Sequence, residues 1–445
     1  MRQRFHFRGG VHPPEYKHQT DQKPVEIMPV PERVVVPLQQ HIGAAADPVV
    51  QKGDEVKTGQ VIGKAGQFVS VPVHASISGT VTAVEPHPHP LGVHVLSVVI
   101  EGDGKDNGYK KYKPSEEFKK LTADEVKECI MKAGIAGMGG AAFPSHVKLS
   151  PPDSKPIDTV ILNGVECEPF LTSDHRLMLE EPDSILEGLK LIMKILNVKK
   201  AIIGIEKNKP DAINLMENKT KSRKNISVLP LKVKYPQGAE KQLIQAATGR
   251  KVPSGGLPMD VGCLVHNVGT ALAIFEAVAM KKPLIERVVT VTGSGIREPK
   301  NLRIRIGTLY KDVIDFCGGL TDQAVKIING GPMMGIAQIS DETPVIKGSS
   351  GLLILDQKSV RIRPENPCIG CARCVDTCPA TLLPTQMAAY IKHGMIDNAY
   401  ALGLPDCIEC GSCGYICPAN IPLVQYFKMG KILWSQAQQK NEQAA

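Results

Sequence analysis

Eight of the twelve cysteines stand in one C-terminal block, with a spacing that suits iron–sulfur chemistry. The motif C-x2-C-x2-C-x3-C-P occurs twice, from Cys368 to Pro379 and from Cys407 to Pro418. With this spacing three thiolates hold one cluster, and the fourth, followed by proline, reaches the cluster of the other motif. The predicted ligand sets of two 4Fe–4S clusters are therefore crossed: Cys368, Cys371, Cys374 and Cys417 for the first, and Cys407, Cys410, Cys413 and Cys378 for the second.

Zinc sites and disulfides are the alternatives for such a block. Zinc sites usually carry two C-x2-C pairs separated by a longer spacer. Disulfides are typical of small secreted proteins, whereas this chain has 445 residues and starts without the apolar core of a signal peptide. We therefore predict two 4Fe–4S clusters in a reducing compartment. Because these clusters pass single electrons, another group must supply or accept the electrons.

A second feature is the glycine-rich stretch GIAGMGGAAFP, from Gly134 to Pro144. Glycines let backbone N–H groups approach a phosphate or a flat ring closely. The common dinucleotide fingerprint lies between a strand and a helix, whereas this stretch follows a predicted helix. From the residues alone, it is either a nucleotide or flavin site or an ordinary tight turn.

The segments around this turn alternate between strand-like and helix-like patterns. A helix is predicted from Thr122 to about Ala133, because Thr122 and Glu125 have capping-box spacing and Gly134 can end it. Predicted strands cover 157–163, 200–206, 225–232 and 262–267; predicted helices cover 184–196, a segment after Pro210, about 238–247 and 270–280. This order predicts a Rossmann-like parallel sheet covered by helices.

Segments of different character flank this α/β unit. Residues 1–30 suggest an extended lead-in, and residues 31–101 suggest short strands separated by glycine and proline. Residues 102–120 are polar and rich in glycine and lysine, which is typical of a linker. Residues 286–335 suggest a small α+β unit. The chain is thus predicted to be a multidomain α/β protein.

The net charge of +8 is concentrated in one region. From Lys190 to Lys251 there are 15 Lys or Arg against 4 Asp or Glu, a local charge of +11. This region could face a phosphate-bearing ligand, an acidic partner or anionic lipid, or it could consist of solvated helix faces. Aromatic residues make up only 4% and no recognition motif is present, so no nucleic-acid partner is expected. No apolar run approaches the roughly 18–20 residues that span a bilayer.

The glycine-rich turn resembles a known flavin site. GMGGAAFPSHVK is similar to the flavin-binding loop in the NADH-oxidising subunit of respiratory complex I and its diaphorase relatives. Three further stretches are similar to that family in matching order: Asn163–Pro169, Tyr235–Glu240 and His266–Thr270. Nearly the whole chain, including FRGGVHPP and NGVECEPFLTSDHRLM, resembles the RnfC family, whose members belong to bacterial Rnf (Rsx) ion-translocating electron-transport complexes.

This resemblance implies a set of domains. They are an N-terminal extension with a biotinyl/lipoyl-like β barrel-sandwich (1–101), a linker (102–120), an FMN- and NADH-binding α/β domain (121–285), a small β-grasp domain of the soluble-ligand-binding type (286–345), and an α-helical ferredoxin-like domain with two clusters (346–445). A carrier barrel needs a lysine at its hairpin tip. Here the tip falls near Gln67 and Phe68, so a structural or docking barrel is expected.

The resemblance also implies residue roles. The cofactor-binding residues would be Gly137, Gly139, Gly140, Ala141, Lys148, Asn163, Glu166, Asn267 and Thr270. Among these, Lys148 would meet the FMN phosphate, and Asn163 and Glu166 the flavin ring or ribityl chain. Asn267 and Thr270 would lie under the flavin. Glu166, Glu168 and Glu240 are the expected catalytic carboxylates, the last two against the nucleotide hydroxyls or the nicotinamide.

The function implied is that of an electron-transfer subunit in a membrane-bound ferredoxin:NAD+ oxidoreductase. Non-covalent FMN would exchange hydride with NAD(H), and the clusters would relay electrons to other subunits and, indirectly, to ferredoxin. The chain would sit peripherally on the cytoplasmic face of the bacterial inner membrane, held by partners. Two alternatives remain: a soluble cobalamin reductase or other diaphorase subunit, and a non-enzymatic electron adaptor without flavin.

Overall fold

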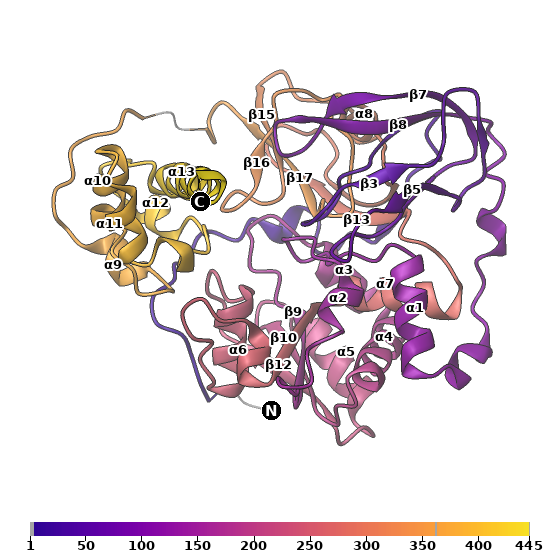
Figure 1. Ribbon diagram of the computed structural model, residues 1–445, viewed down its shortest axis with the longest axis horizontal. Helices are drawn as coiled ribbons and strands as arrows, with labels where there is room; N and C mark the ends of the chain where they lie inside the picture. The colour runs from indigo at the N-terminus through magenta and orange to yellow at the C-terminus, as the bar shows by residue number, and fades with distance from the viewer. Residues whose placement is uncertain (1–3, 361–362, 445) are drawn as a thin grey trace.

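A computed structural model describes residues 4–360 and 363–444, and it contains four packed units (Figure 1). A helical unit lies at the left of Figure 1, and a barrel lies at the upper right. An α/β unit forms the lower part, and a mixed sheet lies above it. This arrangement confirms the predicted fold class, including the separate character of the C-terminal unit.

The α/β unit is built on a four-stranded parallel sheet, as predicted. The strand order is β11-β10-β9-β12, with β9 (Thr159–Gly164), β10 (Ala201–Glu206), β11 (Ile226–Leu231) and β12 (Cys263–Asn267). Every residue of β10 is buried, which is typical of a parallel strand covered on both faces. The connecting helices are α3 (Ser173–Glu180), α4 (Pro182–Ile195), α5 (Pro210–Thr220), α6 (Glu240–Thr248) and α7 (Val268–Ala279).

Local sequence signals explain the ends and the packing of these helices. The helix α1 (Ala123–Lys132) begins with the expected capping box of Thr122 and Glu125, and Gly134 follows it at φ +67°. Between α4 and α7 the backbones approach closely. A Cβ on Gly188 would lie 1.8 Å from the carbonyl oxygen of Ala271, so only glycine fits there.

The barrel unit is all β, as predicted for residues 31–101, and it consists of two antiparallel sheets. One has the order β2-β8-β7-β4, and the other β3-β5-β6. Their strands are β2 (Arg33–Pro37), β3 (Ala46–Pro48), β4 (Glu55–Val56), β5 (Val61–Ala65), β6 (Val73–His74), β7 (Gly79–Pro88) and β8 (His94–Gly102). Gln67 and Phe68 lie in the loop that joins β5 to β6, and Lys64 lies within β5, so the expected tip carries no lysine.

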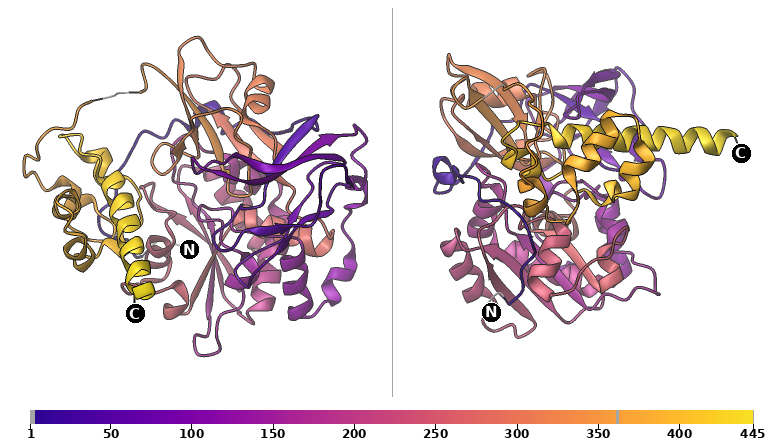
Figure 2. Two further views of the ribbon diagram at one scale, coloured as in Figure 1. Left: turned by 45° about the horizontal axis from the view of Figure 1, so that its top comes forward. Right: turned by 90° about the vertical axis from the view of Figure 1, so that its left-hand side faces the viewer.

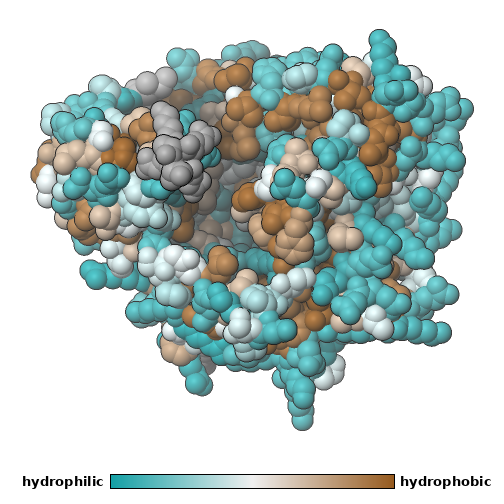
Figure 3. All heavy atoms as spheres, viewed as in Figure 1, coloured by the Kyte–Doolittle hydropathy of each residue, from teal (hydrophilic) through white to brown (hydrophobic). Residues whose placement is uncertain are grey.

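Hydrophobic side chains gather over the barrel at the upper right of the space-filling view (Figure 3). Exposed apolar residues of this unit include Ile42, Val49, Phe68, Leu91 and Val93. The structure thus leaves apolar surface accessible on a unit that has no carrier lysine at its tip.

The mixed sheet extends beyond the segment predicted for it. Its order is β1-β14-β13-β17-β15-β16, with β13 (Glu286–Thr292), β14 (Lys300–Arg305), β15 (Ala324–Asn329) and β16 (Ile336–Ala337). The short helix α8 (Tyr310–Phe316) supplies the helical part of the α+β unit expected there. Two strands come from outside the predicted range: β1 (Val25–Ile27) pairs with β14, and β17 (Gly351–Asp356) pairs with β13 and β15.

These pairings change two of the predicted boundaries. The β-grasp unit continues to Asp356 rather than ending at 345, because β17 fills a central place in its sheet. The lead-in contributes an edge strand through β1 and is therefore part of the packed body. Each strand pairs with segments outside its own part of the sequence, so local patterns did not show that either belongs to this sheet.

The C-terminal unit is helical, as predicted. It contains α9 (Arg373–Thr377), α10 (Pro384–Lys392), α11 (Ile396–Ala401), α12 (Ser412–Ile416) and α13 (Leu423–Ala444) around a core that includes Met387, Leu404 and Phe427. The right-hand view of Figure 2 shows α13 projecting beyond the other units. Within residues 4–360 and 363–444, no helix is long and apolar enough to cross a membrane.

Candidate functional site

The predicted flavin-site residues meet at the carboxyl ends of two neighbouring parallel strands. Asn163 lies near the end of β9 and Asn267 ends β12, and the two residues are direct partners in the strand register. Ligands of open α/β sheets commonly bind outside the carboxyl ends of the strands. The sheet therefore places two residues that are 104 positions apart at one edge.

The glycine-rich turn folds over this edge and is fixed by its own ends and by α7. The N–H of Gly137 donates to the carbonyl of Phe143 (2.8 Å), which closes the turn. The N–H of Met138 donates to Thr270 Oγ1 (2.9 Å), in the first turn of α7. A Cβ on Gly139 would lie 3.1 Å from the Cβ of Asn267. Thr270 and Asn267 thus support the turn from below.

The top of the turn is open. Gly139, Gly140 and Ala141 are exposed. Gly140 has φ +135°, and a Cβ added there would meet no atom within 4 Å. A backbone without side chains beside open space fits a flat ring or a phosphate, because N–H groups can approach the ligand directly. The residues present therefore fit the expected FMN.

Asn267 joins this turn to a half-buried acid, Asp174, which was not among the residues predicted from the sequence. Asn267 Oδ1 caps α7 by accepting from the N–H groups of Gly269 and Thr270, and its Nδ2 donates to Asp174 Oδ2 (2.6 Å). Burial, together with repulsion from Glu166, raises the pKa of Asp174 to about 7.

Arg287 is a second residue that the sequence analysis missed. It is buried, its Nε donates to the carbonyl of Ser349 (2.8 Å), and its Nη2 reaches the carbonyl of Met138 (3.4 Å). A residue of β13 therefore supports the glycine turn of the α/β unit. No local pattern around Arg287 gave a sign of this contact, which joins positions 149 residues apart.

Glu166 is engaged with the start of α3. Its carboxylate accepts from the N–H groups of Asp174 (2.8 Å) and His175 (3.2 Å), the first residues of that helix, and Glu166 itself adopts φ +46°. A carboxylate at a helix N-terminus satisfies free N–H groups and the helix dipole. In this structure Glu166 orders the loop beside the flavin site.

The loop after β9 is held by two buried lysines. Lys17 Nζ donates to the carbonyls of Glu166 (3.0 Å), Glu168 (2.9 Å) and Leu171, and Lys209 Nζ donates to the carbonyl of Val165 (2.8 Å). Burial lowers the pKa of Lys17. No sequence pattern marked Lys17, since the carbonyls it binds are about 150 residues away.

Lys148 and Glu240 form an ion pair, 2.5 Å between Nζ and Oε1. Lys148 ends the short helix α2 (Ser145–Lys148), and Glu240 begins α6. The lysine expected for the phosphate and an acid expected for the nucleotide thus lie together. Asn163 contacts the loop that precedes α6, because its side-chain amide donates to the carbonyl of Gly238 (2.9 Å). Burial, with the nearby Lys148 charge, lowers the pKa of His266 to about 3, so this imidazole is neutral.

Glu168 is turned away from this group of residues. Its carboxylate accepts from the N–H groups of Met333 (3.1 Å) and Met334 (2.8 Å), in the loop between β15 and β16. Burial raises the pKa of Glu168 to about 7, despite these hydrogen bonds. The expected contact of Glu168 with the nucleotide stays a prediction.

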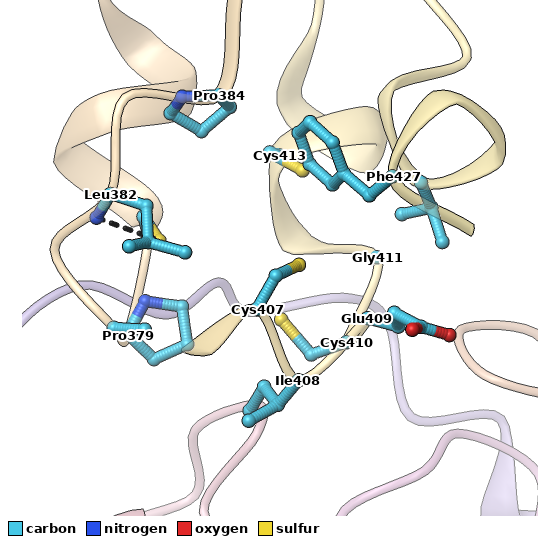
Figure 4. A pocket seen from close by; sticks show the side chains of 13 residues that line it. Pro379, Leu382, Pro384, Cys407, Ile408, Glu409, Cys410, Gly411, Cys413 and Phe427 are labelled. Atoms are coloured by element: carbon cyan, nitrogen blue, oxygen red, sulfur yellow. Dashed lines mark hydrogen bonds between the residues drawn. The ribbon is translucent and has the colours of Figure 1, made fainter. Parts of the chain in front are cut away.

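Four of the cluster cysteines line one cavity (Figure 4). They are Cys378 of the first motif and Cys407, Cys410 and Cys413 of the second. In Figure 4 the side chains of Cys407, Cys410 and Cys413 surround a common space, with Pro379 and Leu382 opposite. These are the four cysteines that the crossed assignment gives to the second cluster, and the assignment itself stays a prediction.

The chemistry of this donor set also fits a cluster. Burial raises the pKa of the Cys407 thiol to about 11, so the positive charge of iron is what would keep it deprotonated. Across the described part of the chain, no three His, Cys, Asp or Glu side chains converge closely enough to bind a single metal ion. Four cysteine thiolates are the ligand set of a 4Fe–4S cluster.

The other four cysteines are the first three of the first motif and the last one of the second motif. Cys368 and Cys371 are exposed, Cys374 is buried and Cys417 is half-buried. Cys374 lies in α9, and Cys417 directly follows α12. Their assignment to the first cluster stays a prediction.

Four family models match successive parts of the chain. They are the RnfC barrel sandwich hybrid domain (residues 5–105), the Nuo51 FMN-binding domain (130–276), the SLBB domain (288–337) and the 4Fe-4S dicluster domain (360–418). Their order is the order of the four structural units.

Several curated proteins are similar over most of the chain. The C subunit of the proton-translocating ferredoxin:NAD(+) oxidoreductase complex of Clostridium ljungdahlii is 52% identical over 88% of this chain and 86% of that protein. The C subunit of the Na(+)-translocating complex of Acetobacterium woodii is 48% identical over 88% of each chain. The C subunit of the ion-translocating oxidoreductase complex of Rhodobacter capsulatus is 42% identical over 99% of this chain and 85% of that protein.

The fold is also found in a solved structure. The NAD+-reducing [NiFe]-hydrogenase in its H2-reduced state contains a chain that matches 68% of this chain and 62% of its own length, with a TM-score of 0.50 and 18% sequence identity. At this identity the likeness concerns the fold alone.

Proposed function

The chain belongs to the RnfC family of ion-translocating oxidoreductase complexes, and from this premise we propose its role in detail. It is an electron-transfer subunit of a ferredoxin:NAD+ oxidoreductase complex, with an FMN-binding domain and a domain for two 4Fe–4S clusters. When bound, FMN supplies hydride exchange with NAD(H), and the clusters supply single-electron transfer.

The chain's own residues would bind and orient the flavin. The N–H groups of the turn around Gly139 and Gly140 would approach the flavin. Thr270 and Asn267 fix the position of the turn, through a hydrogen bond to Met138 and through packing against Gly139. Lys148 would exchange its ion pair with Glu240 for the FMN phosphate, which carries more negative charge than one carboxylate. Glu240 would then be free to accept hydrogen bonds from a nucleotide hydroxyl.

Buried groups beneath this site would control its charge. Asp174 and Glu166 lie close enough to repel each other, and Arg287 offsets part of that charge. Because its pKa is about 7, Asp174 could hold or release a proton near the flavin at physiological pH. We propose that Asp174 and Arg287 belong to the flavin site in addition to the residues predicted from the sequence.

The partners are other subunits of the complex. We propose that the chain binds them peripherally, on the cytoplasmic face of the membrane, and that ferredoxin exchanges electrons with it indirectly through those subunits. The apolar surface of the barrel is one surface available for such contacts. The basic region from Lys190 to Lys251 is a second one.

One observation carries this proposal: an open glycine turn at the carboxyl edge of a parallel sheet and a cavity lined by four cysteines occur in one chain. Anaerobic purification followed by cofactor extraction tests it. We expect one FMN, eight iron and eight sulfide per chain, with resolved flavin absorption bands on top of the broad absorption of the clusters. A protein with full iron and no flavin would be an electron adaptor, and the proposal would be wrong.

A further inference from the structure

Tyr235 links the flavin-binding unit directly to a cluster ligand. Its hydroxyl donates to the carbonyl oxygen of Cys410 (2.7 Å), and its side chain is only 2% exposed. Tyr235 lies in the loop after β11, three residues before Gly238, whose carbonyl accepts from Asn163 of the flavin site. One short loop therefore touches the flavin site at one end and a cysteine of the second cluster at the other.

Glu168, in the loop after β9, connects this contact to the mixed sheet. Its carboxylate accepts from the N–H groups of Met333 and Met334, and it lies 3.4 Å from the hydroxyl of Tyr235. Since a phenol has one proton and the Cys410 carbonyl is nearer, the contact with Glu168 is the weaker of the two. A Cβ on Gly331 would lie 2.3 Å from Glu168 Oε2, so the loop is packed tightly on the carboxylate.

The Met333 loop in turn rests on the second cysteine motif. A Cβ on Gly411, which has φ +81°, would lie 2.7 Å from the carbonyl oxygen of Met333. Tyr235, Met333 and Cys410 belong to one apolar cluster, together with Val11 of the N-terminal segment. Four segments of the chain thus exclude water around Cys410.

A second ligand of the same predicted cluster is also held against the body. The N–H of Gly10 donates to the carbonyl of Thr377 (2.8 Å), and a Cβ on Gly9 would lie 2.7 Å from the carbonyl oxygen of Cys378. The side-chain amide of Gln242 in α6 donates to the carbonyl of Pro379 (3.3 Å). By contrast, Cys368 and Cys371 of the other predicted set are exposed.

We propose that Tyr235 and Glu168 are positioning residues that fix the cluster of Cys407, Cys410, Cys413 and Cys378 against the flavin unit, so that this cluster exchanges electrons with the flavin directly. Tyr235 acts through the Cys410 carbonyl, and Glu168 acts through the Met333 loop. Hydrogen bonds around the ligands and exclusion of water both tune the reduction potential of such a cluster. This inference rests on the proposed function for its flavin step only.

Tyr235→Phe tests the contact, because it keeps the ring and removes only the hydroxyl. The hydroxyl donates to the Cys410 backbone, so the positive end of its dipole lies beside the position expected for the negatively charged cluster. Its loss should therefore lower the reduction potential of the second cluster and leave that of the first unchanged. Redox titration followed by EPR measures both potentials, with signals assigned from Cys371→Ser and Cys407→Ser. Iron and sulfide content of each variant shows that the clusters are intact.

Tyr426→Phe is a matched control in the same unit. The hydroxyl of Tyr426 also makes one hydrogen bond, to Glu365 (2.8 Å), but that contact lies within the helical unit and its linker. This control should leave the potential of the second cluster unchanged. The proposal is overturned if Tyr235→Phe shifts neither potential, or shifts that of the first cluster.

Glu168→Gln tests the second residue. A glutamine side chain offers one acceptor atom instead of two, so one of the two N–H groups of Met333 and Met334 loses its partner and should exchange with solvent faster in hydrogen-exchange mass spectrometry. The potential of the second cluster should shift as well. If the amide exchange of Met333 and Met334 and the potential of the second cluster were both unchanged, Glu168 would not be a positioning residue for this cluster.

Rapid mixing with NADH followed by freeze-quench EPR tests the flavin step. The second cluster should become reduced before the first, and Tyr235→Phe should slow its reduction by about five- to tenfold, the equivalent of one lost hydrogen bond. Earlier reduction of the first cluster would overturn the order. The two potentials are measured by redox titration, which requires neither NADH nor a bound flavin. A failure of the proposed function would therefore leave the test of Tyr235 valid.

Discussion

At the scale of single residues, Gly140 carries both of the properties expected of a cofactor-binding glycine. Its φ of +135° is unfavourable for any residue with a side chain, and the space where a Cβ would stand is open. The resemblance to the flavin-binding loop predicts a cofactor-binding glycine here, and the structure adds the reason why a side chain would be harmful.

Gly140→Val should therefore cause a selective loss of FMN. The valine side chain would enter the open space above the turn and strain the backbone, while the cysteine motifs, more than 220 residues away in the sequence, keep their fold. We expect normal iron and sulfide, clusters that dithionite reduces, and little bound FMN. Chromatographic FMN analysis and iron analysis measure these quantities.

Gly92→Val is a suitable control. Gly92 also has positive φ (+80°) and no atom within 4 Å of an added Cβ, but it lies in the turn between β7 and β8 of the barrel. This variant should retain FMN. Full FMN retention in Gly140→Val would mean that the glycines form only a turn.

Glu286 governs a second residue-scale property, stability in acid. Burial alone would raise its pKa, but Lys282, Arg303 and Arg305 outweigh burial and lower the pKa to about 2. The distance from its Oε1 to Lys282 Nζ is 2.7 Å, and that to Arg303 Nη1 is 3.2 Å. Because the folded pKa lies below the ordinary value of 4.5, Glu286 stabilises the fold above pH 4.5, and this contribution is lost as the pH falls towards 2.

Glu286→Gln should be strongly destabilising at pH 7, by about 3–5 kcal/mol, because it leaves buried cations without their partner. The difference from the unmodified protein should shrink between pH 4.5 and 2, where the natural carboxylate becomes protonated. Thermal unfolding by circular dichroism at pH 7 and pH 3 measures this difference. An equal difference at both pH values would contradict the assignment.

At the scale of elements, the sequence predicted those parts of the fold that depend on neighbouring residues. The helices α1 and α4 and the strands β9 to β12 follow from capping residues and from apolar periodicity, which are properties of one segment. Lys17 depended on contacts about 150 residues away, and β17 on pairing with β13. A pattern within one segment does not contain that information.

The same limit applies to the candidate site. The glycine turn, Asn267 and Thr270 were predicted through a resemblance of local motifs, and the structure brings them together. Asp174 stood inside a quoted stretch but gave no signal of its own, since its raised pKa comes from burial in the folded protein. Glu168 shows the opposite case, because its motif suggested the nucleotide while its carboxylate binds another loop.

The pairing of the two cysteine motifs gives an element-scale prediction. Cys378→Ser should damage the cluster held by Cys407, Cys410 and Cys413, because these four line one cavity. Cys417→Ser should damage the cluster of the first motif. EPR of each variant identifies the affected cluster. If each substitution perturbed only the cluster of its own motif, the crossed assignment would be wrong.

At the scale of the whole molecule, the arrangement of the units bears on membrane attachment. The described residues contain no helix that could span a membrane, and the barrel exposes apolar side chains such as Leu91 and Val93. If attachment depends on partner subunits, high salt or a mild chaotrope should release the protein from membranes without detergent. Immunoblots of washed membranes measure the release, and a strict requirement for detergent would contradict this picture.

The central claim is that electrons from NADH enter at the glycine turn and reach the clusters within this one chain. The most direct test is the addition of NADH to the anaerobically purified protein, with flavin absorption and cluster EPR followed together. We expect flavin bleaching and cluster reduction in the natural protein, and neither in Gly140→Val, although dithionite still reduces its clusters. Natural protein with full FMN and intact clusters, in which NADH reduces neither, would contradict the account.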